Sequence, residues 1–163
     1  QYEWITNAQG YRHHNWYGFG QVDADAAVTY AKNLNSFHGS FITTGAPETG
    51  VSVTINDFSA NTSTITYAKP EGSGGWIEHV RVQVYFEHSV PESVGIRLQS
   101  PSGTLIPILQ PHTNVEGTQQ ILEIGVAGFY LENWEGEWTI SFDDYVSDGF
   151  GGVAEWGLQF YGY

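Results

Sequence analysis

The chain has 163 residues, of which 40% are hydrophobic and 14% charged, so it is long enough for one well-buried core with an extension. Eighteen Asp and Glu against five Lys and Arg give a formal net charge of −13, which predicts no nucleic-acid partner because phosphate backbones are bound through Lys and Arg. No cysteine is present for disulfides, and no apolar run approaches the roughly 20 residues that span a bilayer, so no membrane partner is expected.

The first predicted element is a short helix between Asp23 and Leu34. Small and apolar residues recur there at three- and four-residue spacing, which places them on one helix face: Ala24, Ala27, Val28, Ala31 and Leu34. Asp23 is a suitable N-cap because its carboxylate can accept a hydrogen bond from the first helical turn. The helical spacing stops at about residue 36.

After the helix, apolar and polar residues alternate in many short segments, which is typical of strands with one buried face. Such segments lie at residues 51–55, 65–67, 80–86, 96–98, 122–126, 138–142 and 156–160. Gly and Pro residues between them mark turns, as in the run from Pro70 to Gly75. The pattern predicts an all-β fold, a jelly-roll-like antiparallel β-sandwich with Trp138 and Trp156 in its core, preceded by a short strand-and-helix extension.

Several short motifs occur in a characteristic order in the second part of the chain. They are Ser100-Pro101-Ser102-Gly103-Thr104, Gly136-Glu137-Trp138-Thr139-Ile140, an Asp-rich loop and the terminal Trp156-Gly157-Leu158. In this order they resemble the P domain of kexin-like proprotein convertases, over about residues 40–163. The resemblance implies a domain that packs on the subtilisin-like catalytic domain of the same protease, supports its folding and stability, and tunes its dependence on calcium and pH.

The first part of the chain carries a second resemblance. Asn15-Trp16-Tyr17-Gly18-Phe19-Gly20 before Val22-Asp23-Ala24 is similar to the last strand and helix of a subtilisin-like catalytic domain. The two resemblances divide the chain into residues 1–35, the tail of the catalytic domain, and residues 36–163, the P domain. They imply the C-terminal part of a secreted or extracellular serine endopeptidase.

The family's catalytic groups follow the order Asp, His, Ser, with the Ser in a Gly-Thr-Ser motif upstream of such a tail. This chain has no Gly-Thr-Ser, and His38-Gly39-Ser40 comes after the closing helix, so we interpret it as a linker. A triad needs a nucleophile and base within hydrogen-bond reach and a third group that orients the base. We therefore expect no catalytic residue and no peptide hydrolysis by this chain alone.

The acidic residues Asp143, Asp144 and Asp148 stand close together in a predicted turn between two strands and suggest a metal site. Carboxylate and carbonyl oxygens are the ligands that calcium prefers. The alternative is a turn at the sheet edge in which Asp and Gly serve backbone geometry. Calcium is thus the one cofactor that the residues themselves suggest, and the six scattered histidines show no zinc spacing.

Other functions compete with the auxiliary role. Six Trp and ten Tyr could provide platforms for sugar rings in a carbohydrate-binding β-sandwich module, with Trp76 and Trp134 least accounted for by strand phase. A module that recruits protein substrates is a further alternative. Acidic residues around Trp134, namely Glu132, Glu135 and Glu137, are interpreted as a solvated rim.

Without the body of a catalytic domain, the apolar residues of the first 35 positions lose a covering. They include Trp4, Trp16, Tyr17 and Phe19 as well as the helix face. Because exposed apolar surface favours association, we expect this segment to fold back onto the sandwich, to mediate self-association, or to stay bound to a separate catalytic fragment.

Overall fold

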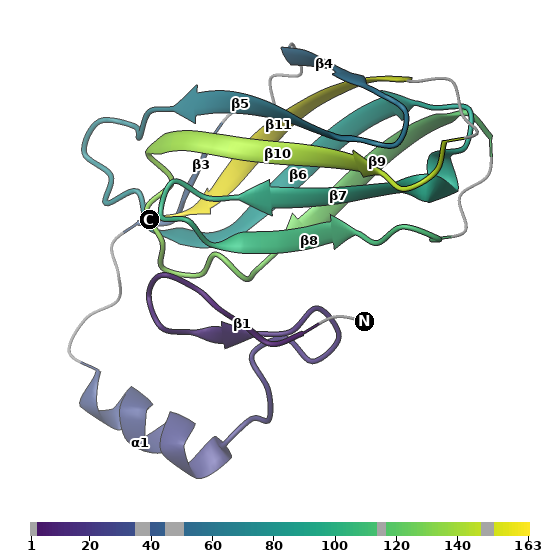
Figure 1. Ribbon diagram of the computed structural model, residues 1–163. Coiled ribbons are helices and arrows are strands. Elements are labelled where there is room, and N and C mark those ends of the chain that lie inside the picture. The colour runs from purple at the N-terminus through teal and green to yellow at the C-terminus, as the bar shows by residue number, and fades with distance from the viewer. Residues whose placement is uncertain (1–2, 35–39, 45–50, 114–116, 148–151) are drawn as a thin grey trace.

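The computed structural model describes residues 3–34, 40–44, 51–113, 117–147 and 152–163 (Figure 1). Two antiparallel sheets pack face to face and enclose one core, with a small hairpin and a helix outside them. One sheet has the order β5-β10-β7-β8, and the other has the order β3-β11-β6-β9, with β4 also paired to β11. The predicted antiparallel β-sandwich is confirmed.

The four-stranded sheet is centred on β10 (Gly136–Asp144), which pairs with β5 (Ala60–Tyr67) and β7 (Val94–Gln99); β8 (Leu105–Leu109) forms its edge beyond β7. Side chains alternate between the two faces of a strand. Trp138, Ile140 and Phe142 consequently all point inward and are fully buried. The core position predicted for Trp138 is confirmed.

The five-stranded sheet is built on the long pair β6 (Ile77–Glu87) and β11 (Gly152–Gly162). β9 (Gln119–Val126) pairs with β6, while β3 (Ile42–Thr43) and β4 (Val51–Ile55) pair with the two ends of β11. Val80, Val82, Val84 and Phe86 of β6 are fully buried, as is Trp156 of β11. The alternation in the sequence therefore reports the inner face of this sheet correctly.

The indole N–H groups of two core tryptophans are hydrogen-bonded. Trp138 Nε1 donates to the carbonyl oxygen of Trp134 at 2.9 Å, and Trp156 Nε1 donates to Ser63 Oγ at 3.0 Å. A buried polar group without a partner would destabilise the fold, so these bonds let the large indole rings contribute apolar burial at little polar cost.

The residues before the sandwich form a hairpin of β1 (Ile5–Thr6) and β2 (Arg12–His13), followed by helix α1 (Ala24–Asn33). Asp23 caps the helix, because its Oδ1 accepts from the backbone N–H of Ala26 at 2.9 Å, as predicted. The predicted domain boundary after residue 35 lies outside the described residues. In the part of the chain that the structure describes, no helix has the length and apolar character needed to cross a membrane.

A short 3-10 helix, η1 (Pro91–Ser93), connects β6 to β7. Among the described strands of five residues or more, β8 alone lies outside the sets predicted from alternation, because Leu105-Ile106-Pro107-Ile108-Leu109 is apolar at every position and shows no period of two. Pro107 is compatible with an edge position, since proline cannot donate to a neighbouring strand.

Candidate interface between the N-terminal segment and the sandwich

Residues 3–20, which we call the docking segment, lie against the sandwich beside the β8 edge, whereas α1 lies farther from it (Figure 1). Asn7 provides the first anchor. Its Oδ1 accepts from the backbone N–H of Gln9 and Tyr11 at 3.0 and 2.9 Å, which shapes the hairpin turn. Its Nδ2 donates to the carbonyl oxygens of Gly128 and Tyr130 at 3.1 and 2.9 Å. One buried amide thus both shapes the turn and fastens it to the sandwich.

A buried carboxylate provides the second anchor. Glu132 Oε1 accepts from the backbone N–H of Ala8 at 3.1 Å and from Thr104 Oγ1, and Oε2 accepts from Ser100 Oγ at 2.5 Å. Hydrogen bonds to a charged group are stronger than neutral ones, and a buried carboxylate needs them. The Ser100–Thr104 turn therefore serves the interface, by holding the carboxylate that receives the docking segment.

The position of Glu132 corrects the interpretation that Glu132, Glu135 and Glu137 form a solvated rim. Glu135 and Glu137 are exposed, but Glu132 is fully buried. Leu131, just before it, adopts φ 60°, in the left-handed region that non-glycine residues rarely occupy. Leu131 thus marks a local turn of the backbone directly before the buried Glu132 side chain. The spacing of acidic residues in the sequence does not reveal this turn.

Ring contacts add to the interface. Tyr130 meets Tyr11 edge to face with ring centroids 5.2 Å apart, and meets Phe19 at 5.7 Å. Gly128 allows close approach here, because an added Cβ would lie 2.4 Å from Ile106 Cδ1 and 3.1 Å from His13 Nδ1. Asn15 Nδ2 also donates to the carbonyl oxygen of Pro107 on the β8 edge at 2.8 Å.

His13 is buried in this interface, and its Nδ1 has no hydrogen-bond partner among the described residues. Burial lowers the pKa of His13, and the neighbouring His14 lowers it further. The docked arrangement therefore favours the neutral imidazole of His13, which connects docking to pH.

Several aromatic side chains of the docking segment are largely exposed beside the sandwich, and so is the helix that follows. Trp16 is 70% exposed, Tyr17 is 63% exposed, and α1 has no buried residue. Surface of this kind is typical of a site that another protein surface covers. The docking segment therefore lies folded back on the sandwich, as one of the three expectations predicts, and keeps aromatic surface exposed to solvent.

The predicted metal residues do not converge. Asp143 and Asp144 are neighbours in β10, and successive side chains of a strand point to opposite faces. Asp143 Oδ2 accepts from Arg97 Nε at 2.8 Å, while Asp144 bonds to different residues on the other side. Asp148 lies outside the described residues. Within the described ranges, no group of three or more His, Asp or Glu is placed to hold a metal ion, and calcium stays a prediction.

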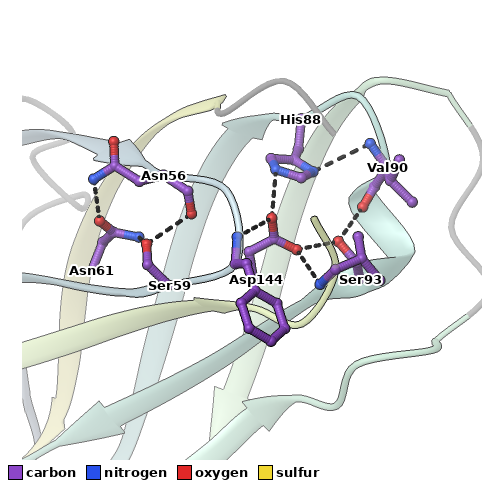
Figure 2. A network of polar contacts seen from close by, with 9 residues as sticks. Asn56, Ser59, Asn61, His88, Val90, Ser93 and Asp144 are labelled. Atoms are coloured by element: carbon purple, nitrogen blue, oxygen red, sulfur yellow. Dashed lines mark hydrogen bonds and ion pairs between the residues drawn. The ribbon is translucent and has the colours of Figure 1, made fainter. Parts of the chain in front are cut away.

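Asp144 is the centre of a buried network (Figure 2). Its Oδ1 accepts from Ser93 Oγ at 2.6 Å, and His88 Nε2 lies 3.4 Å from Oδ2. Burial alone would raise the pKa of Asp144, but the Ser93 hydroxyl, the backbone N–H groups of Val146 and Phe58, and His88 together lower it. The network joins the β6–β7 connection to the end of β10, so its evident role is structural.

Ser93, His88 and Asp144 are the residue types of a hydrolytic triad, yet their arrangement differs from one. Ser93 and His88 both approach Asp144, and the Ser93 hydroxyl donates instead of meeting the His88 imidazole. All three are buried. A triad requires the nucleophile to bond to the base, so this cluster is not arranged for acyl transfer.

The two tryptophans considered for sugar binding differ in position. Trp134 is fully buried and cannot present a ring face to a sugar, whereas Trp76 is 42% exposed. Trp4 and Trp16 are also exposed, but both belong to the docking segment. Among the described tryptophans of the sandwich, only Trp76 is exposed, because Trp134, Trp138 and Trp156 are buried. The sugar-binding hypothesis therefore gains no support from Trp134.

Comparisons with known proteins agree with this architecture. The sequence profile of the proprotein convertase P-domain family matches residues 77–160, just over half of the chain. Proprotein convertase subtilisin/kexin type 6 from Homo sapiens is 28% identical over 180 residues, with 98% of this chain and 18% of the relative covered. The type 5 protein from Rattus norvegicus is 27% identical, with 98% and 9% covered. The chain thus spans less than a fifth of these relatives' length.

A similar fold is found in the crystal structure of a serine protease of Aeromonas sobria, with a TM-score of 0.81 and 22% sequence identity. The likeness covers 98% of this chain and 33% of that one, so it includes the N-terminal segment as well as the sandwich. The same protease has also been solved in complex with a chaperone. The family profile matches more than half of the chain, and the order of motifs and the sandwich agree with it. The chain therefore belongs to the proprotein convertase P-domain family.

Proposed function

We propose that the chain is the auxiliary C-terminal part of a secreted subtilisin/kexin-like serine endopeptidase, in which it supports the folding and stability of the catalytic domain. One observation carries the proposal. The docking segment, which resembles the tail of a catalytic domain, is fastened to the sandwich by Asn7 and Glu132 and exposes the aromatic rings of Trp16 and Tyr17.

The physical basis of this role is coupling between two folded parts. Contacts that exist only when both parts are folded stabilise both by mass action, and a covalent connection makes the second contact effectively intramolecular. The docking segment is continuous with the catalytic tail and hydrogen-bonded to the sandwich, so it would transmit this stabilisation directly. No catalytic group from the sandwich is required.

The test uses the whole protease that contains this chain, with Asn7→Ala. Asn7 lies outside the sandwich sheets, so its loss removes the anchor while the sandwich core remains intact. We expect a lower melting temperature of the catalytic domain and a smaller fraction of active sites after refolding. Asn56→Ala, which removes a hydrogen bond to Asn61 in an exposed turn, is the matched control. Equal active fractions in the two variants would contradict the proposal.

Calcium dependence forms a narrower part of the proposal. Since Asp143 and Asp144 face opposite sides of β10, one ion could use at most one of them together with Asp148. A ligand of the native state at 100 times its dissociation constant adds about 2.7 kcal/mol. The chain melted with calcium and with a chelator should then differ by several degrees, and equal melting temperatures would remove calcium from the proposal.

Self-association through residues 1–35 is an expected behaviour of the chain when the catalytic body is absent. The exposed rings of Trp16 and Tyr17 are the apolar surface available for it. Light scattering over a range of concentrations would detect a dimer, and Trp16→Ser should reduce it. A strict monomer at high concentration would show that this surface is too small to drive association by itself.

A further inference from the structure

An open groove lies where the docking segment meets the outer face of the five-stranded sheet. Its volume is about 530 Å³, and Phe19, Glu78, His79, Tyr130 and residues 125–127 line it. Gly125 leaves its floor open, because an added Cβ there would meet no other atom within 4 Å. The groove adjoins the Asn7 anchor, because Asn7 bonds to the carbonyl oxygen of Tyr130, but neither Asn7 nor Glu132 lines it.

The walls of the groove are aromatic and differently oriented. The rings of Phe19 and Tyr130 have centroids 5.7 Å apart and planes at 62°, so they form a corner. The imidazole of His79 stacks on Tyr161 at 4.3 Å with planes 8° apart, which fixes its orientation. Aromatic faces attract organic cations through the negative charge of their π-systems.

Glu78 supplies a negative charge beside these rings. It is exposed, and no described Lys, Arg or His forms an ion pair with it. Two arginines of β6 and β2 have other partners, since Arg81 pairs with Glu123 and Arg12 lies over the Trp4 ring. The groove thus contains a carboxylate whose charge no described cation balances.

Tyr163, whose charge interacts with that of Glu78, adds no charge to the groove at physiological pH. Burial and the hydrogen bond with Tyr130, together with the charges of Tyr130, Glu78 and Tyr11, raise the pKa of Tyr163 to about 12. Tyr163 is therefore a neutral phenol at physiological pH. The charge of the groove comes from Glu78, in a chain whose formal net charge is −13.

We propose that this groove binds an organic cation, an alkylammonium or guanidinium group that lies against Phe19, Tyr130 and His79 and pairs with Glu78. Charge complementarity selects a cation over an anion, and the aromatic corner selects an organic cation over a hydrated metal ion. The proposal stands independently of the protease role, because it depends only on the groove.

The groove has a consequence for the docking segment. Phe19 belongs to that segment, whereas Glu78, His79 and Tyr130 belong to the sandwich, so the complete site exists only in the docked arrangement. A ligand that binds the docked form alone must stabilise it. Cation binding is therefore expected to slow the exchange of amide hydrogens in residues 3–20.

The test uses NMR titration of the chain at low salt, because screening weakens exposed charge pairs. The probes are choline, methylguanidinium and 3,3-dimethylbutan-1-ol, a neutral molecule with the shape of choline. We expect saturable shifts of the amides of residues 78, 79 and 125–130 with at least one cation and none with the alcohol. If neither cation saturates up to about 50 mM, or if the alcohol binds equally well, the proposal fails.

Two variants and a matched control identify the binding residues. Glu78→Gln should weaken cation binding about three- to fivefold, the scale of one exposed charge pair, and Gly125→Val should remove binding by filling the open floor. Glu155→Gln takes the same charge from the paired strand β11 outside the groove and should leave binding unchanged. Binding that Glu78→Gln leaves intact, or that Glu155→Gln weakens equally, would overturn the assignment to Glu78.

Discussion

The docking segment and α1 are consecutive in the chain but differ in how they are held. Asn7 and Ala8 of the docking segment donate hydrogen bonds to the sandwich, and the ring of Tyr11 meets that of Tyr130. In α1 no residue is buried, and Val28 and Tyr30 are largely exposed. Resemblance places both in the catalytic tail, yet by their contacts only the docking segment is part of the sandwich unit. The change from held to exposed residues falls between residue 20 and α1, and the domain boundary after residue 35 stays a prediction.

The largest expected effect comes from the core that supports the docking segment. Trp138→Ala removes a fully buried indole from the inner face of β10, and such truncations destabilise by about 3–5 kcal/mol. Urea unfolding followed by far-UV circular dichroism measures the loss. Trp76→Ala, at a 42% exposed position, is the control and should cost far less. Similar losses in both variants would mean that the core is placed incorrectly.

A smaller effect is expected from a substitution that weakens the attachment of the docking segment to the sandwich. Glu132→Gln replaces one carboxylate oxygen by an NH2 group, so the hydroxyl of Ser100 or Thr104 loses its acceptor, at about 1–3 kcal/mol for a buried unsatisfied group. Hydrogen exchange of residues 3–20 should accelerate more than that of β6. Glu137→Gln, at an exposed position, is the control. A variant in which residues 3–20 keep full protection would show that Glu132 does not anchor them.

Acid should weaken docking through His13. Its pKa is lower in the docked state than its ordinary value of 6.5, so the undocked state binds a proton first. The contribution of His13 to the stability of the docked state is fully present above pH 6.5, and it is lost as the pH falls through the lowered pKa. Exchange rates of residues 3–20 between pH 7.5 and 5, corrected for intrinsic rates, should rise more steeply than those of His13→Gln. Parallel profiles would exclude His13 as the sensor.

The smallest effect belongs to α1. Tyr30→Ala changes an exposed side chain that contacts nothing in the core, and such substitutions usually alter stability by less than about 0.5 kcal/mol. In the whole protease the same change should matter more if the catalytic domain covers this helix. Equal melting temperatures of wild type and Tyr30→Ala in both contexts would argue against that covering.

The sandwich could be predicted well because burial imprints a period of two on its strands. Val80, Val82, Val84 and Phe86 alternate with polar residues, and Trp138 and Trp156 stand in phase with their own strands. The helix was predictable from its spacing and from Asp23 as N-cap. β8 was missed, since a wholly apolar strand around Pro107 carries no period.

The interface could not be predicted because its partners are distant in sequence. Asn7 bonds to Gly128, 121 residues away, and no local sequence pattern predicts such a contact. Glu132 resembled a rim residue beside Glu135, although it is buried. The motif Ser100–Thr104 was recognisable as a family turn, but only the structure shows that its hydroxyl groups hold Glu132.

Hydrogen exchange of the chain in solution tests the difference between the docking segment and α1 most directly. Amides of residues 5–13 should exchange slowly, on the scale of the sandwich strands, and those of α1 should exchange close to the rate of unstructured peptide. If residues 5–13 exchange as fast as α1, the docking segment is not fastened to the sandwich and the account is wrong.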